Sequence, residues 1–152
     1  MTTVGQVEKR TQNRVVKLFR EQLGYDYLGD WTEREGNRNI EEALLRTFLR
    51  DRQGYDEALV TRALHLLGKE AGDTSKSLYD RNRAVYDVLR YGVKVKAEVG
   101  ENTQTVWLID WKRPEQNHFA IAEEVTVPGA DAKAHTKRPD VVLYVNGIAL
   151  GM

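Results

Sequence analysis

The sequence contains no cysteine and few histidines, and these absences narrow what the protein can be. Without cysteine, neither disulfide bonds nor thiolate metal sites can form among its 152 residues. The 3 histidines show no His-x-x-x-His spacing, so a zinc site is not expected. No apolar run approaches the roughly 18 residues that suggest a membrane span. The first ten residues, MTTVGQVEKR, lack the apolar core of a signal peptide, so a cytoplasmic location is expected.

The chain also has no net charge, because 23 Lys and Arg residues balance 23 Asp and Glu residues. This balance argues against a surface that attracts nucleic acid everywhere, although it leaves room for a local basic groove. The motifs of several enzyme classes are missing: the dinucleotide-binding GxGxxG, a P-loop with GKS or GKT, and the GxSxG nucleophile elbow. Dinucleotide binding, P-loop ATP hydrolysis and serine-esterase chemistry are therefore not predicted for this chain.

The N-terminal segment has the periodicity of an amphipathic helix. In residues 5–25, apolar Val15, Phe19 and Leu23 recur every fourth position, and Gly24 follows as a stop. Residues 25–38 contain no comparable pattern and are predicted to be an irregular connection.

Three more helices are predicted before residue 93. Asn39 is expected to open the first of them, because Glu42 follows three residues later as in a capping box. The next is predicted near residues 56–69. The last begins near Ser77 and ends at Gly92, with an inward face made of Leu78, Val85, Tyr86 and Leu89.

The second half of the chain changes to the period of two that is typical of strands. Strands are predicted at 93–99, 105–111, 119–127 and 141–145. Asn146-Gly147 is the strongest hairpin signal and favours a type I′ turn. The chain is therefore predicted to be one α+β domain over residues 1–152, in which a helical N-terminal half packs on a mostly antiparallel or mixed central sheet.

Several residues of the predicted strands have two interpretations each. Trp107 and Trp111 would share one face of a strand, where core packing is the default and base stacking the alternative. Asp110 at a strand end is interpreted as a turn cap rather than as part of a cleft. Glu123 and Glu124 are adjacent, so they should point to opposite faces of the sheet and only one could face a cleft.

The last hairpin predicts what should lie opposite Asp140. A two-residue turn places Val145 opposite Ile148, so Asp140 would face position 153. The strand at 141–145 is apolar on both faces and should have a full-length neighbour, yet the returning segment has only a few residues. The chain is therefore expected to be a fragment of a longer protein, although a natural end with a frayed tail is the alternative.

Asp140 itself, which follows Pro139, has two possible roles. It could accept hydrogen bonds from loop amides at the strand entry, which is the favoured role for an isolated aspartate. It could instead be a metal ligand. A second carboxylate near position 153 or 154 would favour the metal role, because Mg²⁺ is commonly held by one or two carboxylates.

Five segments resemble, in this order, the N-terminal nuclease domain of the type I restriction enzyme R (restriction, or motor) subunit. They are QNRVVKLFREQLGYDYLGDW, NRNIEE, YDVLRYGVKV, VWLIDWKRPEQNHFAIAEEVTV and KRPDVVLYVNGIAL. The resemblance covers about residues 8–150, and RPDVVLYVNGIAL is its most specific part. It implies a PD-(D/E)xK nuclease fold, in which an Asp and a Glu-x-Lys pair on adjacent strands bind Mg²⁺. Pro139-Asp140 matches the first half of this motif, whereas the Glu and Lys would follow GIALG and are absent here.

The resemblance also implies a function and partners. The parent protein would hydrolyse DNA phosphodiesters with Mg²⁺ after ATP-driven translocation, together with a modification (methyltransferase) subunit and a specificity subunit. Its substrate would be double-stranded DNA, and no membrane would be involved. The isolated chain is expected to be inactive and to hold no metal tightly. The alternatives are a catalytically dead module that binds DNA or partner subunits, and a repair or recombination endonuclease.

The same resemblance suggests further site residues. Related nucleases often carry an acidic residue on the first helix near the metal, and the best matching position here holds Gln12, with Glu8 one turn earlier. Both could instead be surface residues of an amphipathic helix. Lys137 and Arg138 lie beside Asp140 and could hold a phosphate, or they could belong to a solvated loop.

Overall fold

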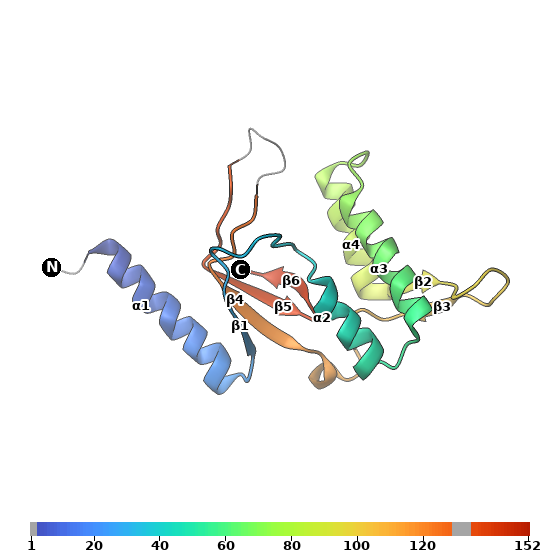
Figure 1. Cartoon of the computed structure of the whole chain (residues 1–152), viewed down its shortest axis with the longest axis horizontal. Helices are drawn as coiled ribbons and strands as arrows, with labels where there is room; N and C mark the ends of the chain where they lie inside the picture. Colours follow the sequence, from blue (N-terminus) through green and yellow to red (C-terminus); the bar gives the residue numbers. More distant parts are fainter. Residues whose placement is uncertain (1–2, 129–134) are drawn as a thin grey trace. The chain divides into compact units, whose positions relative to one another are not determined.

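The computed structural model describes residues 3–128 and 135–152, and it forms two compact units (Figure 1). The first unit comprises Met1–Glu41 and His118–Met152, and the second comprises Glu42–Asn117. Helices and sheets in both units agree with the predicted α+β class, while the PD-(D/E)xK core and the single domain stay predictions. Within the described residues, no helix is both long enough and apolar enough to cross a membrane.

A four-stranded mixed sheet forms the centre of the first unit. Its order is β1 (Asp26–Asp30), β4 (Phe119–Glu123), β5 (Val141–Val145) and β6 (Ile148–Gly151). The strands β4, β5 and β6 are antiparallel neighbours, whereas β1 runs parallel to β4. The prediction that residues 25–38 are an irregular connection was therefore wrong for β1. Its sequence, DYLGD, lacks a clear strand pattern because Gly29 interrupts the alternation of side chains. The pairing register between β1 and β4 also shifts beside Gly29.

One core cluster of this unit lies on one face of the sheet. Ala120 and Ala122 on β4 face Tyr144 and Val142 on β5, and all four side chains are buried. The two small alanines leave space for the aromatic rings of Trp31 and Tyr144. The centroids of these rings lie 5.6 Å apart. This packing fixes β4 and β5 side by side, and the candidate site lies at one end of the two strands.

The last hairpin forms at Asn146-Gly147, as predicted. Both residues have positive φ angles of 52° and 82°, and Val145 pairs with Ile148, as a type I′ turn requires. Asn146 is fully buried, and its side-chain oxygen accepts a hydrogen bond of 2.7 Å from the His118 N–H. Farther from the turn the register shifts by one residue, since Leu143 pairs with Gly151. The expectation that Asp140 faces position 153 therefore does not hold for this ladder.

The outer edge of β6 explains why the predicted capping box is wrong. Ile40 forms an antiparallel bridge with Ile148, and the Asn39 carbonyl accepts a 2.8 Å hydrogen bond from the Ala149 N–H. The backbone at Asn39 is thus committed to the sheet edge and cannot open a helix. The helix α2 begins later, at Glu42, and ends at Thr47.

The first helix is held mainly by polar contacts. The α-helix α1 (Val4–Lys17) continues as a π-helical segment over Leu18–Gln22, and Val16 is the one buried residue of α1. The predicted stripe was wrong for Val15 and Leu23, which are 37% and 54% exposed. Phe19 does contact an aromatic ring, that of Tyr25, at a centroid distance of 4.9 Å.

The second unit contains the remaining helices and a small sheet. After α2 and a π-helical segment (Phe48–Arg52) come α3 (Glu57–Gly72) and α4 (Leu78–Tyr91). The side chains of Asp56 and Ser77 cap α3 and α4 by accepting hydrogen bonds from Leu59 N–H and Asp80 N–H. The strands β2 (Val93–Val95) and β3 (Gln104–Val106) pair antiparallel, and a short 3₁₀ helix spans Pro114–Gln116.

Two predictions for the second unit were wrong in detail. The strands predicted at 93–99 and 105–111 are shorter, because pairing stops at Val95 and at Val106. The face of α4 predicted to be inward is partly solvent-exposed, since Leu78 and Tyr86 are 66% and 60% exposed. Apolar periodicity located this helix correctly but overestimated how much of it is covered.

Candidate functional site

Asp140 lies directly before β5, beside the end of β4, and its backbone is well anchored. Its carbonyl oxygen accepts a hydrogen bond of 2.9 Å from the Glu124 N–H, and the Pro139 carbonyl accepts one of 3.1 Å from the Val125 N–H. The Asp140 side chain is exposed and makes no hydrogen bond or ion pair with residues 3–128 or 135–152. A fixed backbone thus presents a carboxylate that bonds none of the described loop amides.

The Asp140 carboxylate lies in an open groove of about 570 Å³ between α1 and the start of β5. The groove is lined by Val7, Glu8, Thr11, Gln12, Val15, Pro139, Asp140, Val141 and Met152. Glu8 and Gln12 reach it together because residues four apart share one face of a helix. The structure therefore places both helix residues singled out from the sequence in the same groove as Asp140, and their roles stay predictions.

Gln12 is the direct link between α1 and the strand ends. Its side-chain Nε2 donates a hydrogen bond of 2.7 Å to Glu123 Oε2 and one of 3.3 Å to the Asp140 carbonyl oxygen. An amide nitrogen carries two protons, so both acceptors are served by one group. Gln12 is thereby fixed beside Asp140 instead of moving freely on the helix surface.

Glu123, the last residue of β4, was not assigned to the site from the sequence. Its carboxylate accepts hydrogen bonds of 2.7 Å from Gln12 and 2.7 Å from the Tyr27 hydroxyl, and Lys9 Nζ lies 3.7 Å away. Burial, the hydrogen bond to Glu123 and the Glu123 charge together raise the pKa of Tyr27 to about 12. No local signal could reveal this cluster, because Tyr27 and Gln12 lie 96 and 111 residues away along the chain.

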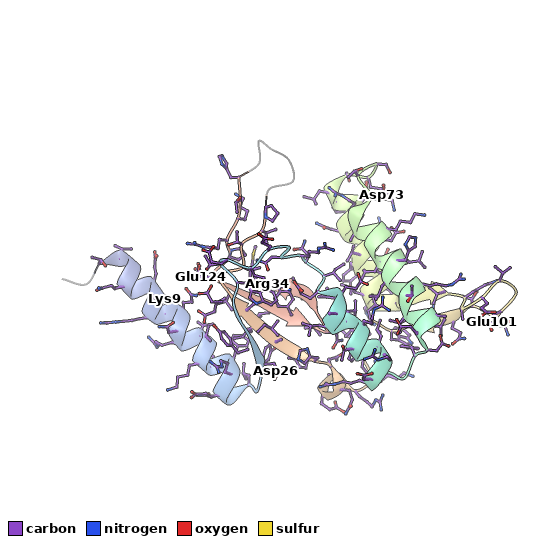
Figure 2. All side chains as sticks on the ribbon, in the orientation of Figure 1. Lys9, Asp26, Arg34, Asp73, Glu101 and Glu124 are labelled. Carbon is purple, nitrogen blue, oxygen red and sulfur yellow. The ribbon has the colours of Figure 1, made fainter. Side chains whose placement is uncertain are left out.

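Glu123 and Glu124 do not point to opposite faces, which corrects the prediction for this pair. Glu124 has a φ angle of 50°, so the alternation of the strand ends there. Lys9 Nζ lies 3.7 Å from Glu123 and 3.6 Å from Glu124, and one cation therefore bridges both carboxylates. Figure 2 shows Lys9 on α1 and Glu124 at the adjacent strand end.

The two basic residues before Asp140 differ in their contacts. Arg138 Nε lies 3.1 Å from Glu124 Oε2, so its guanidinium is already engaged in an ion pair. The Lys137 backbone pairs with Val127, and its ammonium group has no ion-pair partner in the described part of the chain. Phosphate binding by either residue stays a prediction, and the contacts favour Lys137 as the available cation.

The donor chemistry of the groove suits a hard cation, although a full ligand set is not present. Among the described residues, no three His, Asp or Glu side chains lie close enough together to hold a metal ion. Asp140 and Glu8 are the carboxylates that line the groove. Carboxylate oxygens with completing waters are the ligands that Mg²⁺ prefers. Asp140 is the residue that fits one Mg²⁺ ligand position, and further ligands would be required.

Asp110 and the tryptophans belong to the second unit. Asp110 caps a turn as interpreted, because its carboxylate accepts a 2.9 Å hydrogen bond from the Arg113 N–H. The default of core packing was wrong for Trp107 and Trp111, which are 38% and 48% exposed. The chain leaves the strand after Val106, so the two indoles do not follow a buried strand face.

Comparison with known proteins assigns the chain to a family. Residues 5–152 match the family described as type I restriction enzyme R protein N terminus, and the chain belongs to this family. A segment of 74 residues is 34% identical to the putative type I restriction enzyme MjaIXP endonuclease subunit of Methanocaldococcus jannaschii. That segment covers 47% of this chain and 7% of that protein, so the match spans a small part of the relative's length. The resemblance found in the sequence is confirmed, and the family suggests a nuclease parent.

Proposed function

We propose that this chain is the N-terminal part of a type I restriction enzyme R subunit that hydrolyses DNA phosphodiesters with Mg²⁺ after ATP-dependent translocation. The observation that carries the proposal is the Asp140 carboxylate, which is exposed on an anchored backbone and lines the groove beside α1. Pro139-Asp140 would supply the first half of the PD-(D/E)xK motif that the resemblance implies.

Each groove residue would have a distinct task. Asp140 would hold the metal, which when bound would activate the attacking water and stabilise charge on the phosphate. Gln12 would orient a water through its side-chain oxygen, and it would bind a phosphate oxygen only by releasing its N–H bond to Glu123 or to the Asp140 carbonyl. Glu8 would reach the metal only through water or a shift of its side chain. Lys137 would contact the DNA backbone, and Arg138 would do so only by giving up Glu124.

The ladder register suggests where the second carboxylate of the motif would lie. Leu143 pairs with Gly151, so Asp140, three residues earlier, would face position 154, three residues later. We propose that the parent protein carries the glutamate of Glu-x-Lys there, with the lysine two residues beyond. Without these two groups the isolated chain would bind metal weakly and would not cut DNA.

The remaining elements of the proposal come from the family. Double-stranded DNA would be the substrate, and a modification (methyltransferase) subunit and a specificity subunit would be the partners. ATP would be used by a motor region of the parent, since no P-loop lies in this sequence. The assembly would work in the cytoplasm.

Metal binding by the chain itself tests the role of Asp140. Amide resonances of the ¹⁵N-labelled chain would be followed while Mn²⁺ is added, because this paramagnetic ion broadens signals of nearby nuclei. We expect weak, saturable broadening centred on residues 140–141 and 8–12, which Asp140→Asn removes. Asp30→Asn is the matched control, since Asp30 lies at a strand end but bonds Thr32. Broadening that survives Asp140→Asn would contradict the assignment.

Plasmid nicking by the isolated chain separates the proposal from its alternative. We expect no nicking with Mg²⁺, and nicking that Asp140→Ala abolishes would show that this chain alone holds a complete site. Salt-sensitive DNA binding that Asp140→Ala leaves unchanged, together with no metal binding at Asp140, would favour a catalytically dead binding module.

A further inference from the structure

The second unit contains a separate open cavity of about 520 Å³ that the proposed nuclease site does not use. It is lined by Gln53, Arg90, Trp107, Ile109, Asp110, Trp111, Lys112 and Arg113, and is called the tryptophan groove below. All of these residues belong to Glu42–Asn117, so the groove is complete within one unit.

The two tryptophans of the groove are exposed yet held in place. Trp107 and Trp111 are 38% and 48% exposed, whereas Trp31 in the first unit is 8% exposed. The Trp111 indole Nε1–H donates a 2.9 Å hydrogen bond to the Leu89 carbonyl. The Trp107 backbone N–H donates a 3.0 Å hydrogen bond to the Tyr55 hydroxyl, which anchors the main chain at this residue. Two large aromatic side chains are thus presented to solvent, with the Trp111 indole and the Trp107 main chain held by hydrogen bonds.

Cations line the same groove as these rings. The Arg90 guanidinium lies 5.5 Å from the Trp111 ring centroid, and neither Arg90 nor Lys112 has an ion-pair partner within the described residues. Arg113 is bound to Asp110 at 3.2 Å, so that pair is internally neutral. Burial alone would raise the pKa of Asp110, but the Arg113 N–H and guanidinium outweigh it and lower that pKa. The lining therefore carries an excess of two positive charges, on Arg90 and Lys112.

The loop that carries these groups is preorganised. The Asn117 side-chain nitrogen donates hydrogen bonds of 3.0 Å to the Asp110 carbonyl and 2.9 Å to the Pro114 carbonyl. The Asn117 side-chain oxygen accepts a 2.8 Å bond from the Asp110 N–H. A ligand would therefore not need to order this loop, which lowers the entropic cost of binding.

We propose that the tryptophan groove binds single-stranded DNA, with unpaired bases stacked on Trp107 and Trp111 and phosphates near Arg90 and Lys112. Exposed aromatic faces next to unpaired cations are the combination that single-strand binding proteins use. An apolar peptide would bury Arg90 and Lys112 without a counter-charge, which is unfavourable. Duplex DNA would satisfy the cations but could not offer its stacked bases to the indoles. The proposal does not depend on the nuclease assignment of Asp140.

Tryptophan fluorescence and anisotropy with a labelled oligothymidylate of about 12 nucleotides test the proposal on the full chain. We expect quenching of the tryptophan emission and tighter binding of the single strand than of a duplex of equal length. The matched pair Trp111→Phe and Trp111→Leu both lose the bond to Leu89, but only phenylalanine keeps an aromatic face. Leucine is expected to weaken binding about ten-fold or more, and phenylalanine much less.

Charge and control variants complete the test. Lys112→Gln should reduce the slope of log affinity against log salt by about 0.7, whereas Lys69→Gln, an exposed lysine on α3, should not change it. Trp31→Phe, in the core of the first unit, should leave binding unchanged. Equal binding by Trp111→Phe and Trp111→Leu would overturn the proposal, as would equal affinity for duplex without quenching, or no binding at low salt.

Discussion

Replacing Glu123 with glutamine is predicted to loosen α1 from the sheet although the side chain keeps its shape. The carboxylate accepts hydrogen bonds from both Gln12 and Tyr27, and it lies 3.7 Å from Lys9. In glutamine one of the two terminal oxygens becomes an NH₂ group, so the negative charge is lost and the Tyr27 hydroxyl has to accept from this group instead of donating. Both charge-assisted bonds are therefore replaced by weaker neutral ones.

The magnitude follows from the kind of contact that is lost. A hydrogen bond to a charged group contributes about 1.5–3 kcal/mol to stability. The ion pair with Lys9 adds about 0–1 kcal/mol, because the Lys9 side chain is 51% exposed. We therefore expect Glu123→Gln to lower the free energy of unfolding by about 2–3 kcal/mol. The effect should concentrate in α1, which has Val16 as its one buried residue.

The same substitution should change the titration of Tyr27. The pKa of Tyr27 is raised to about 12 in the folded chain, against 10.0 for an unperturbed tyrosine. The folded state thus favours the neutral phenol, and this contribution is complete below about pH 10 and is lost as pH rises towards 12. Ultraviolet difference titration, with Tyr27→Phe identifying the signal, should show this pKa moving towards 10 in Glu123→Gln.

Urea unfolding and hydrogen exchange supply the assay, and the neighbouring glutamate supplies the control. Among residues 3–128 and 135–152, Glu124→Gln removes side-chain contacts to the exposed Arg138 and Lys9, so a loss below about 1 kcal/mol is expected. Amides of α1 should exchange faster in Glu123→Gln than in Glu124→Gln. If the two variants unfold alike and α1 exchanges as in the wild type, the reasoning about this cluster is refuted.

Two backbone positions give further predictions. Gly92→Ala should lower the free energy of unfolding by about 1–3 kcal/mol, because Gly92 has a φ of 79° and a ψ of 168° and a Cβ there would press on Thr105. Thermal unfolding measures this loss, and an unchanged midpoint would contradict it. Asn146→Ala should be more destabilising than Asn146→Gly by about 1 kcal/mol. Both variants lose the hydrogen bond to His118, but glycine adopts a φ of 52° more readily than alanine. Equal urea midpoints of the two variants would contradict this.

Local signals predicted local structure well. The Asn146-Gly147 turn and the helix that Asp56 caps were found because a few neighbouring residues determine each of them. Strand β1 was missed because its identity depends on parallel pairing with β4, about ninety residues later, as in Asp26 with Ala120. The helix expected at Asn39 failed for a similar reason, since the open edge of β6 competes for that backbone.

For the candidate site too, some residues were predictable from the sequence and others depend on tertiary contacts. Asp140 was singled out from the last hairpin and then from the family resemblance, whereas Gln12 and Glu8 came from the resemblance alone. The structure brings all three into one groove. The supporting pair of Glu123 and Tyr27 could not be named, because tertiary contacts alone bring them together. The exposed tryptophans were assigned to the core because a strand was predicted through them, and the strand ends before both.

DNA cleavage by the assembled restriction complex tests the central claim most directly. The proposed parent R subunit carrying Asp140→Asn would be combined with the modification and specificity subunits proposed as its partners, and ATP hydrolysis and plasmid cleavage would be measured together. The account predicts that ATP hydrolysis continues at the wild-type rate while Mg²⁺-dependent cleavage falls by at least about a thousand-fold. Cleavage at the wild-type rate by the Asp140→Asn complex would contradict the assignment of Asp140 as the metal ligand of the nuclease.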